Sequence, residues 1–226
     1  MRTLRLYLNN QLDQLINWTL VEDDQTTSNG SSFLNEFSSF ENVQIEAYLN
    51  AGCCSIFKTD KVSGISTKRL TDELILGLIE EDLVDDIEVL KPIMMRIEDN
   101  LAYIAIFNRD FYEQLISQLI NLDKPIKLVQ SYVYSTNIDE DAKQWVLHLS
   151  PEQNFVRTSQ FQYYLLDDML PLPELFENML TNSENKPEQI MVYSDHTHDL
   201  NAYSKKFNIS FDYATEPPQF GIPVWN

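Results

Sequence analysis

Two histidines separated by one residue are the sharpest candidate for metal chemistry. They lie in the run Asp195-His196-Thr197-His198-Asp199, after a predicted strand. Residues at i and i+2 of an extended backbone share a face, so both imidazoles could bind one ion and serve a metal-dependent hydrolase. Catalytic zinc uses three protein ligands with orienting partners, and His148 is the only other histidine. The same residues would also be found in a polar loop in which Asp199 caps the next helix, so we expect no metal site.

Turns that bind phosphate are the second chemistry to consider. Such turns need glycine or a helix amino terminus, because the backbone must approach the phosphate oxygens closely. The chain has 5 glycines in 226 residues and contains neither GxxxxGK[ST] nor GxGxxG. The turn at residues 9–15 has Asp13 but no glycine, and the turn at 150–154 has Pro151 but no aspartate. We therefore expect no ATP hydrolysis and no bound cofactor.

Paired carboxylates and cysteines complete the candidates for catalysis. A two-metal nuclease of ribonuclease H-like form usually takes one carboxylate from its first strand, and residues 4–8 contain none. Pairs such as Asp23-Asp24 and Asp167-Asp168 are expected as a solvated surface in a chain with 35 acids. Cys53 and Cys54 lie in a predicted strand without an identifiable histidine partner, which favours core packing. We expect no catalytic residue among these groups.

Charge excludes whole classes of partner. Lys and Arg number 16 and Asp and Glu number 35, so the formal net charge is −19. Such a chain repels phosphate backbones and anionic lipid surfaces, and we expect no nucleic-acid partner. The adjacent cysteines cannot easily bridge, which indicates a reducing compartment. No apolar stretch reaches the ~18 residues of a membrane helix, and no secretory core is visible, so we expect the chain to be soluble.

Hydrophobic periodicity predicts an α/β protein with two related lobes, each of which starts with a strand hairpin and ends in alternating helices and strands. We place the first lobe at residues 1–136, with an inserted helical segment at about 64–90, and the second at 137–226. Residues 22–32 are predicted to be a loop. The expected strands are 4–8, 16–21, 43–49, 53–57, 101–107, 128–134, 145–149, 155–158, 161–166, 190–193 and 209–213. The expected helices are 33–40, about 67 onward, 109–122, 173–180 and 200–207.

The predicted helix from about Thr67 breaks a local rule. Its apolar face is formed by Leu70, Leu74 and Leu78 with neighbouring isoleucines, and acidic residues follow at its carboxyl end. A helix dipole prefers cations there, and Lys68 and Arg69 in the first turn also have the unfavourable sign. Violations of this kind often mark functional surfaces. One interpretation is a surface for a basic partner, and the other is that acids occur everywhere in such a chain. The candidate partner-binding residues are Glu80, Glu81, Asp82, Asp85 and Asp86.

Several segments resemble one known family. The run ISTKRLTDELILGLIEEDLVDDIEVL is similar to a leucine-rich helix that ends in acids. LAYIAIFNRDFYEQLISQLINLDKPIKLVQSYVY is similar to the following strand, helix and strand, and QWVLHLSPEQNFVRTSQFQYYLLDD to a second-lobe hairpin. FGIPVWN is similar to the entry into a linker before a membrane helix. These segments resemble the cytoplasmic domain of the type II secretion system L protein (GspL family).

The resemblance implies a two-lobed actin-like (ribonuclease H-like) fold with mixed β-sheets that has lost nucleotide hydrolysis. It implies a non-enzymatic adaptor at the cytoplasmic face of the bacterial inner membrane, which binds the amino-terminal domain of the secretion ATPase. A membrane helix and a periplasmic domain, absent from this chain, would reach other inner-membrane platform proteins. The alternative is a nucleotide-binding actin-like assembly protein similar to the type IV pilus M component. The sequence leaves open whether the domain forms a homodimer.

Overall fold

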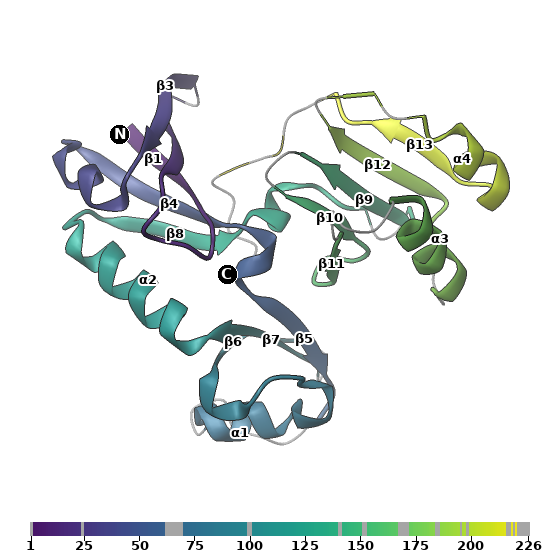
Figure 1. The fold of residues 1–226 in the computed structure, drawn as a ribbon, viewed down its shortest axis with the longest axis horizontal. Helices are drawn as coiled ribbons and strands as arrows, with labels where there is room; N and C mark the ends of the chain where they lie inside the picture. Colours follow the sequence, from purple (N-terminus) through teal and green to yellow (C-terminus); the bar gives the residue numbers. More distant parts are fainter. Residues whose placement is uncertain are drawn as a thin grey trace. The chain divides into compact units, whose positions relative to one another are not determined.

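The computed structural model divides the chain into two units, Met1–Tyr132 with Pro223–Asn226 and Val133–Ile222 (Figure 1). Each unit is built around its own five-stranded mixed sheet. The structure describes residues 2–23, 25–61, 70–98, 101–139, 142–150, 153–166, 172–183, 186–194, 196, 197, 199–215, 218 and 220.

The sheet of unit 1 has the strand order β3-β2-β1-β4-β8. β1 pairs antiparallel with β2 and parallel with β4, and β4 pairs parallel with β8. Alternate residues of β1 explain its two faces, because Leu4, Leu6 and Leu8 are buried in the main core while Arg5 and Tyr7 lie on the opposite side. The strands are β1 (Arg2–Leu8), β2 (Ile16–Glu22), β3 (Gln25–Ser32), β4 (Val43–Leu49) and β8 (Ile126–Ser131).

A long helix, α2 (Arg109–Asn121), packs on the leucine side of this sheet. Its N-cap is Asn108, whose side chain accepts a hydrogen bond of 3.0 Å from the backbone N–H of Phe111. Leu115 and Leu119 are buried in the same core as β1. The short 3-10 helix η1 (Leu34–Ser39) also joins this core. The predicted helix after Asn108 is therefore confirmed.

A small subdomain is inserted in unit 1 between β4 and α2. Its three-stranded antiparallel sheet has the order β5-β7-β6, with β7 in the centre as its seven-residue apolar run predicts. The helix α1 packs against this sheet and shares a separate hydrophobic core with it (Figure 1). The elements are η2 (Ala51–Cys53), β5 (Ser55–Thr59), α1 (Asp72–Gly77), η4 (Glu80–Asp82), η5 (Ile87–Val89), β6 (Leu90–Glu98) and β7 (Leu101–Asn108).

The sheet of unit 2 repeats the topology of unit 1, with the order β11-β10-β9-β12-β13. β9 pairs antiparallel with β10 and parallel with β12, and β12 pairs parallel with β13. A 3-10 helix, η6 (Tyr132–Ser135), precedes these elements. They are β9 (Gln144–Leu149), β10 (Asn154–Arg157), β11 (Tyr163–Leu165), α3 (Leu172–Asn182), β12 (Gln189–Ser194), α4 (Asn201–Phe207) and β13 (Ser210–Tyr213). The α/β class and the expected repeat of strand order are confirmed.

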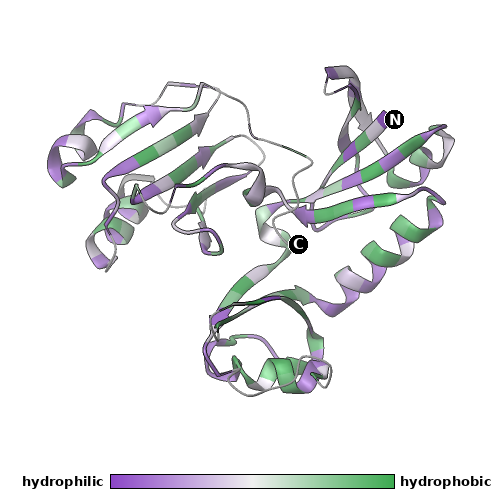
Figure 2. Cartoon of the chain, turned by 180° about the vertical axis from the view of Figure 1, so that it is seen from behind, coloured by the Kyte–Doolittle hydropathy of each residue, from purple (hydrophilic) through white to green (hydrophobic). Residues whose placement is uncertain are grey.

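Two local predictions were wrong for physical reasons. The segment predicted as a loop after residue 22 contains β3, an edge strand whose side chains are almost all exposed, so it has no apolar period to read (Figure 2). The predicted helix from Thr67 is only the six residues of α1 among the described residues, and positions 62–69 lie outside them. Leu74, predicted on its buried face, is 55% exposed.

The cysteines also differ from their predicted setting. Cys53 ends the 3-10 helix η2, and β5 begins only at Ser55, so neither cysteine lies in a strand. Cys53 is buried, and its Sγ lies 3.8 Å from the carbonyl oxygen of Leu8. Burial raises the pKa of the Cys53 thiol to about 12, which keeps it protonated and unreactive at neutral pH.

Within the part of the chain that the structure describes, we find no helix with the length and apolar character needed to cross a bilayer.

Candidate functional site

The candidate surface is the acidic segment, which we define as residues 80–89 of the inserted subdomain. It follows α1, whose N-cap is Thr71 and whose Ile75, Leu76 and Ile79 are buried in the core of the subdomain. Leu83 and Ile87, on the segment itself, pack against the same core. These apolar side chains hold the backbone of the acidic segment in place along its length.

A cation from α2 fixes the far end of the acidic segment. The Arg109 guanidinium donates hydrogen bonds to the carbonyl oxygens of Glu88 and Leu90, at 3.2 and 2.7 Å. Lys91 pairs with Asp72 of α1 at 2.7 Å, which joins the start of α1 to β6. The segment is therefore tied at both ends to regular elements rather than suspended as a free loop.

The five predicted partner-binding acids are all exposed. Glu81 forms an ion pair of 3.1 Å with Lys61, and both side chains are largely in solvent. The Asp86 carboxylate accepts a hydrogen bond of 3.2 Å from the backbone N–H of Glu88. Among the described residues, no Lys or Arg pairs with Glu80, Asp82 or Asp85. The structure places these carboxylates on one continuous stretch of chain, and their role in binding stays a prediction.

One exposed valine lies between these acids and another follows them, a feature that the sequence reasoning missed. Val84 is 99% exposed and Val89 is 48% exposed. Both flank the carboxylates of Asp85 and Asp86 in the chain. An exposed apolar group within a charged rim is the composition of a protein interface, where the apolar group gains by burial and the charges set the choice of partner. The signal in the sequence was the interruption of the acidic run by Val84.

The helix-dipole argument for this surface was wrong. α1 begins at Asp72 and ends at Gly77, so its first turn carries Asp72 and Glu73, the favourable sign for a helix amino terminus. The acids from Glu80 onward follow the helix in 3-10 and extended backbone rather than in its last turn. Lys68 and Arg69 lie outside the described residues. The case for this surface therefore rests on exposure and charge, not on a violated dipole.

Two backbone amides of the first hairpin turn donate hydrogen bonds within the turn. The backbone N–H of Gln11 donates to the Asn9 side chain at 2.8 Å, and that of Gln14 donates to the carbonyl of Gln11 at 3.3 Å. Leu12 is buried in the main core. These amides are already satisfied within the turn, so they do not form the open cradle that a phosphate needs.

The second hairpin turn is occupied in the same way. The backbone N–H of Ser150 donates to Asn154 Oδ1 at 3.0 Å, and that of Gln153 donates to Ser150 Oγ at 3.2 Å. Pro151 lies outside the described residues. The amides of Ser150 and Gln153 therefore already donate to side chains of the turn and are not free to donate to phosphate oxygens.

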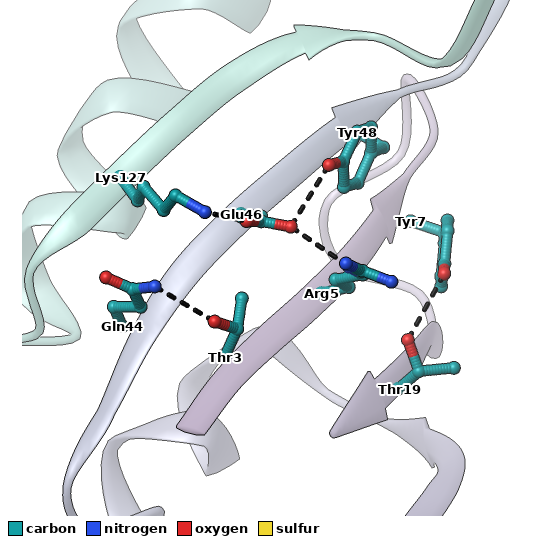
Figure 3. Close-up of polar contacts among 8 residues, drawn as sticks. All are labelled: Thr3, Arg5, Tyr7, Thr19, Gln44, Glu46, Tyr48 and Lys127. Carbon is teal, nitrogen blue, oxygen red and sulfur yellow. Dashed lines mark hydrogen bonds and ion pairs between the residues drawn. The ribbon is translucent and has the colours of Figure 1, made fainter. Parts of the chain in front are cut away.

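A buried ionic network in unit 1 was not predicted from the sequence (Figure 3). Glu46 of β4 is 1% exposed and pairs with Arg5 at 3.0 Å and with Lys127 at 2.7 Å. Burial acts to raise the pKa of the Glu46 carboxyl, but the hydrogen bonds from Lys127 and Arg5 outweigh it and hold this pKa below its usual range. Tyr48 also donates to Glu46 at 3.1 Å. Its partners saturate the carboxylate, so we assign it a structural role.

The histidines do not come together as a metal site in the described residues. His196 is exposed after β12, and His198 and Asp195 lie outside the described residues. His148 is buried in β9, where its ring stacks on Phe155 at 4.7 Å between centroids. Asp199 accepts a hydrogen bond of 3.2 Å from the backbone N–H of Asn201. The N-cap of α4 is Leu200, without a side-chain cap hydrogen bond, so the expected cap at Asp199 was wrong. No group of three or more potential ligands was found among the described residues.

Comparison with known proteins identifies the fold. The sequence matches no protein-family model and no curated protein sequence. The structure is similar to the cytoplasmic domain of EpsL, an inner membrane component of the type II secretion system of Vibrio cholerae. That match has a TM-score of 0.70 and 14% identity, and it covers 99% of this chain and 91% of the other.

Two further solved structures share this architecture. One is a Bacteroides thetaiotaomicron protein of unknown function with an actin-like ATPase fold, at TM-score 0.52 and 11% identity over 96% of this chain and 92% of that one. The other comes from the PilM–PilN type IV pilus biogenesis complex, at TM-score 0.61 and 8% identity over 94% and 88%. The predicted actin-like fold and the predicted likeness to the L-protein domain are confirmed.

Proposed function

We propose that this chain is a non-enzymatic adaptor of a type II secretion or related pilus-type assembly. The observation that carries the proposal is the likeness to the EpsL cytoplasmic domain over 99% of the chain. The proposed partner is the amino-terminal domain of the secretion ATPase, which the chain would hold at the cytoplasmic face of the inner membrane. Other platform proteins would be reached through parts of the protein beyond this chain.

The acidic segment is the proposed contact for that ATPase domain. Its backbone is tied down by Leu83, Ile87 and Arg109, so little conformational entropy is lost when a partner binds. The exposed acids attract a basic surface, and Val84 supplies apolar area to bury. We expect the charges to speed association and select the partner, and the valines to slow dissociation.

We also propose that the chain is not an enzyme, and the hydrogen bonds within its two hairpin turns support this. Two backbone amides in each hairpin turn already donate hydrogen bonds within that turn, to Asn9 and the Gln11 carbonyl in the first and to Asn154 and Ser150 in the second. A nucleotide would have to displace these internal hydrogen bonds before it could bind through the same amides. This favours an actin-like frame that serves as a binding module.

Titration calorimetry of the chain against the ATPase amino-terminal domain tests the proposal, at about 50 mM and about 500 mM salt. The test variant reverses Glu80, Glu81 and Asp82 to lysine, and the control variant reverses Asp13, Glu36 and Glu113. All three control residues are exposed and lie outside the segment, and both variants change the net charge equally. We expect micromolar or tighter binding that weakens with salt, and at least tenfold weaker binding for the test variant alone.

Each other outcome contradicts part of the proposal. Equal loss in both triple variants would mean that total charge, rather than the acidic segment, governs binding. Binding unaffected by salt and by both variants would keep the adaptor but remove the acidic contact. Failure to bind at either salt would contradict the adaptor.

The alternative is a nucleotide-binding actin-like assembly protein similar to the type IV pilus M component, since the fold is shared with a protein of the PilM–PilN complex and with one of actin-like ATPase fold. Titration of the chain with ATP and Mg²⁺ separates the two functions. We expect no heat of binding at millimolar nucleotide, because two amides in each turn already donate hydrogen bonds within the turn. Submillimolar affinity for ATP would favour the alternative.

A further inference from the structure

The outer strands of the three sheets differ in how they are protected from pairing with another chain. An edge strand exposes unpaired backbone N–H and C=O groups, and proteins usually protect it by short length, charged side chains or proline. β11 and β13 have three and four residues, and β5, β6 and β8 contain Lys58, Pro92 and Lys127. β3 has eight residues, with neither charge nor proline. Among the described strands, β3 is therefore the long edge that lacks this protection.

The regular part of β3 is Ser28–Ser32, at the edge of the unit 1 sheet (Figure 1). These five residues pair with β2 without interruption, and the register shift between the two strands lies nearer the hairpin turn, at Leu20/Val21. Every residue of β3 is exposed except Ser32, which is half-buried. In the described structure, β3 therefore presents a backbone edge of five regularly paired residues to solvent.

The surroundings of β3 are uncharged as well. Residues 14–21 and 25–35, which include β2 up to Val21 and all of β3, contain no Lys, Arg, Asp or Glu. Charged residues make up 23% of the whole chain, so this hairpin departs from the composition of the rest. A chain with a net charge of −19 repels its own copies through its acidic faces, and an uncharged edge is a surface that two copies can bring together.

Two exposed apolar side chains lie at the open end of the β2–β3 hairpin. Ile16 pairs with Ser32, so Leu15 and Phe33 occupy neighbouring positions just beyond the last pair. Leu15 is 56% exposed and Phe33 is 46% exposed. The backbone of Phe33 is extended, so it continues the line of β3. Both side chains would be stabilised by burial against another chain.

We propose that β3 pairs antiparallel with β3 of a second copy of this chain. Strands add to exposed sheet edges in this way, and the main-chain hydrogen bonds supply the affinity. Gly30 is the middle residue of the regular part, and a two-fold axis at Gly30 sets each Ser28 opposite a Ser32. It also sets each Asn29 opposite a Ser31, so the cross-strand contacts are small and uncharged. The unit 1 sheets of the two copies then form one continuous sheet.

The antiparallel orientation separates the acidic turns of the two copies. The β2–β3 turn contains Glu22 and Asp23, and Asp23 precedes Gly30 by seven residues. At about 3.4 Å per residue, the turn lies about 24 Å from the two-fold axis, and the two turns lie about 48 Å apart. The Debye length is about 8 Å at physiological ionic strength, so these charges hardly repel each other. A parallel pair would bring the two turns together, which like-charge repulsion disfavours.

The salt dependence of this dimer has the opposite sign to that of the proposed ATPase contact. Salt screens the repulsion between two chains of net charge −19 and leaves an uncharged interface unaffected, so the dimer should strengthen as salt is added. Binding of a basic surface to the acidic segment should weaken instead. A strand pair of five residues per copy is small beside a standard stable interface of about 1,600 Å², so we expect a dissociation constant on the order of 100 µM.

Analytical ultracentrifugation of the full chain, from about 10 to about 500 µM and at about 50 and about 500 mM salt, tests the inference. The like-charge variant, Asn29→Asp/Ser31→Asp, sets carboxylates opposite each other across the two-fold axis. The charge-swapped variant, Asn29→Asp/Ser31→Lys, sets opposite charges there and keeps the net charge. Both variants lose the hydrogen bond from Ser31 to Asn17, so they differ in charge alone. The control, Gln114→Glu/Asn201→Asp, adds two negative charges at exposed positions on α2 and α4.

We expect a dimer that strengthens with salt, at least tenfold weaker association of the like-charge variant, and natural or stronger association of the charge-swapped variant and natural association of the control. A chain that stays monomeric at every concentration would overturn the inference. So would a dimer that persists in the like-charge variant, that the charge-swapped variant does not restore, or that weakens with salt. The triple variant of Glu80, Glu81 and Asp82 should still dimerise, even if its affinity for the ATPase domain falls.

Discussion

The two sheets share one strand order and one set of strand directions, yet their connections differ. In unit 1 the chain passes from β4 to α2 through a whole subdomain at residues 50–108, whereas in unit 2 it passes from β12 to α4 through residues 195–200. The acidic segment belongs to the insertion. The comparison indicates that the two similar sheets serve as a scaffold. The candidate recognition surface lies on the subdomain inserted into unit 1.

The core sides of the two sheets differ as well. In unit 1, Trp18 of β2 packs against Phe37 and Phe40 at 6.5 and 5.2 Å between centroids, and its ring lies over Gly30 of β3. A Cβ at Gly30 would approach that ring to 3.1 Å, so the glycine makes room for the tryptophan. In unit 2 a groove of about 540 Å³, the α3 groove, lies between α3 and the β10–β11 hairpin and is lined in part by Trp145 and Met179.

The largest loss of stability is expected in the aromatic core of unit 1. Phe37 is completely buried, and Phe37→Ala should lower the free energy of unfolding by about 4 kcal/mol because it leaves a cavity beside Trp18. Met179→Ala in the groove of unit 2 should cost about 1 kcal/mol, because that side chain is only partly buried. Urea unfolding of both variants measures the difference. Equal losses would mean that the two units are packed alike.

The next comparison sets a buried ion pair against an exposed one. Glu46→Gln in unit 1 should cost about 3 kcal/mol, because it leaves the Arg5 cation without its buried counter-charge. Glu188→Gln in unit 2 removes an exposed pair with Lys143 and should leave the unfolding midpoint unchanged. A larger shift for the Glu188 variant would refute this ranking of the two pairs.

Protonation of Glu46 should lower the stability of the fold at acidic pH. The folded-state pKa of Glu46 lies below its unfolded value, so its contribution is present above about pH 4.5 and is lost as pH falls through the lower folded pKa. Glu46→Gln removes a proton-binding group and should flatten the stability profile below pH 4.5. Thermal unfolding of both proteins between pH 3 and 7 measures this, and parallel profiles would show that Glu46 is not linked to folding.

The smallest loss of stability is expected at the amino termini of α2 and α4, the corresponding helices of the two units. Asn108→Ala removes the side-chain acceptor at the start of α2 and should cost about 1 kcal/mol. Asp199 precedes α4, a helix of only seven residues whose assigned N-cap is Leu200, so Asp199→Ala should cost a few tenths of a kcal/mol. Denaturant titrations of the two variants would contradict this order if the Asp199 variant were the less stable.

Local patterns predicted much of this frame. The alternation in β1, the apolar run 101–107 of β7 and the capped amphipathic α2 each encode their structure within a few residues. The polar edge strand β3 and the short α1 could not be read in this way. β3 is defined by its pairing with β2, and α1 by its packing in the subdomain core. Apolar spacing alone overestimated the length of that helix.

The candidate sites were less accessible to sequence reasoning. The acids of the segment were evident, but the exposure of Val84 required the fold of the subdomain. Glu46 gains its partners from strands 41 and 81 residues away in sequence, and the α3 groove joins a hairpin to a helix. Contacts between distant segments leave no local pattern, so only the tertiary structure reveals them.

Hydrogen exchange of the chain, with and without the ATPase amino-terminal domain, tests the central claim most directly, because it reports which backbone amides a partner protects. The account predicts slower exchange at residues 80–89 and unchanged exchange at the groove residues 158–166 and 178–183. Protection confined to the groove, or no protection at residues 80–89 in a complex that demonstrably forms, would contradict it.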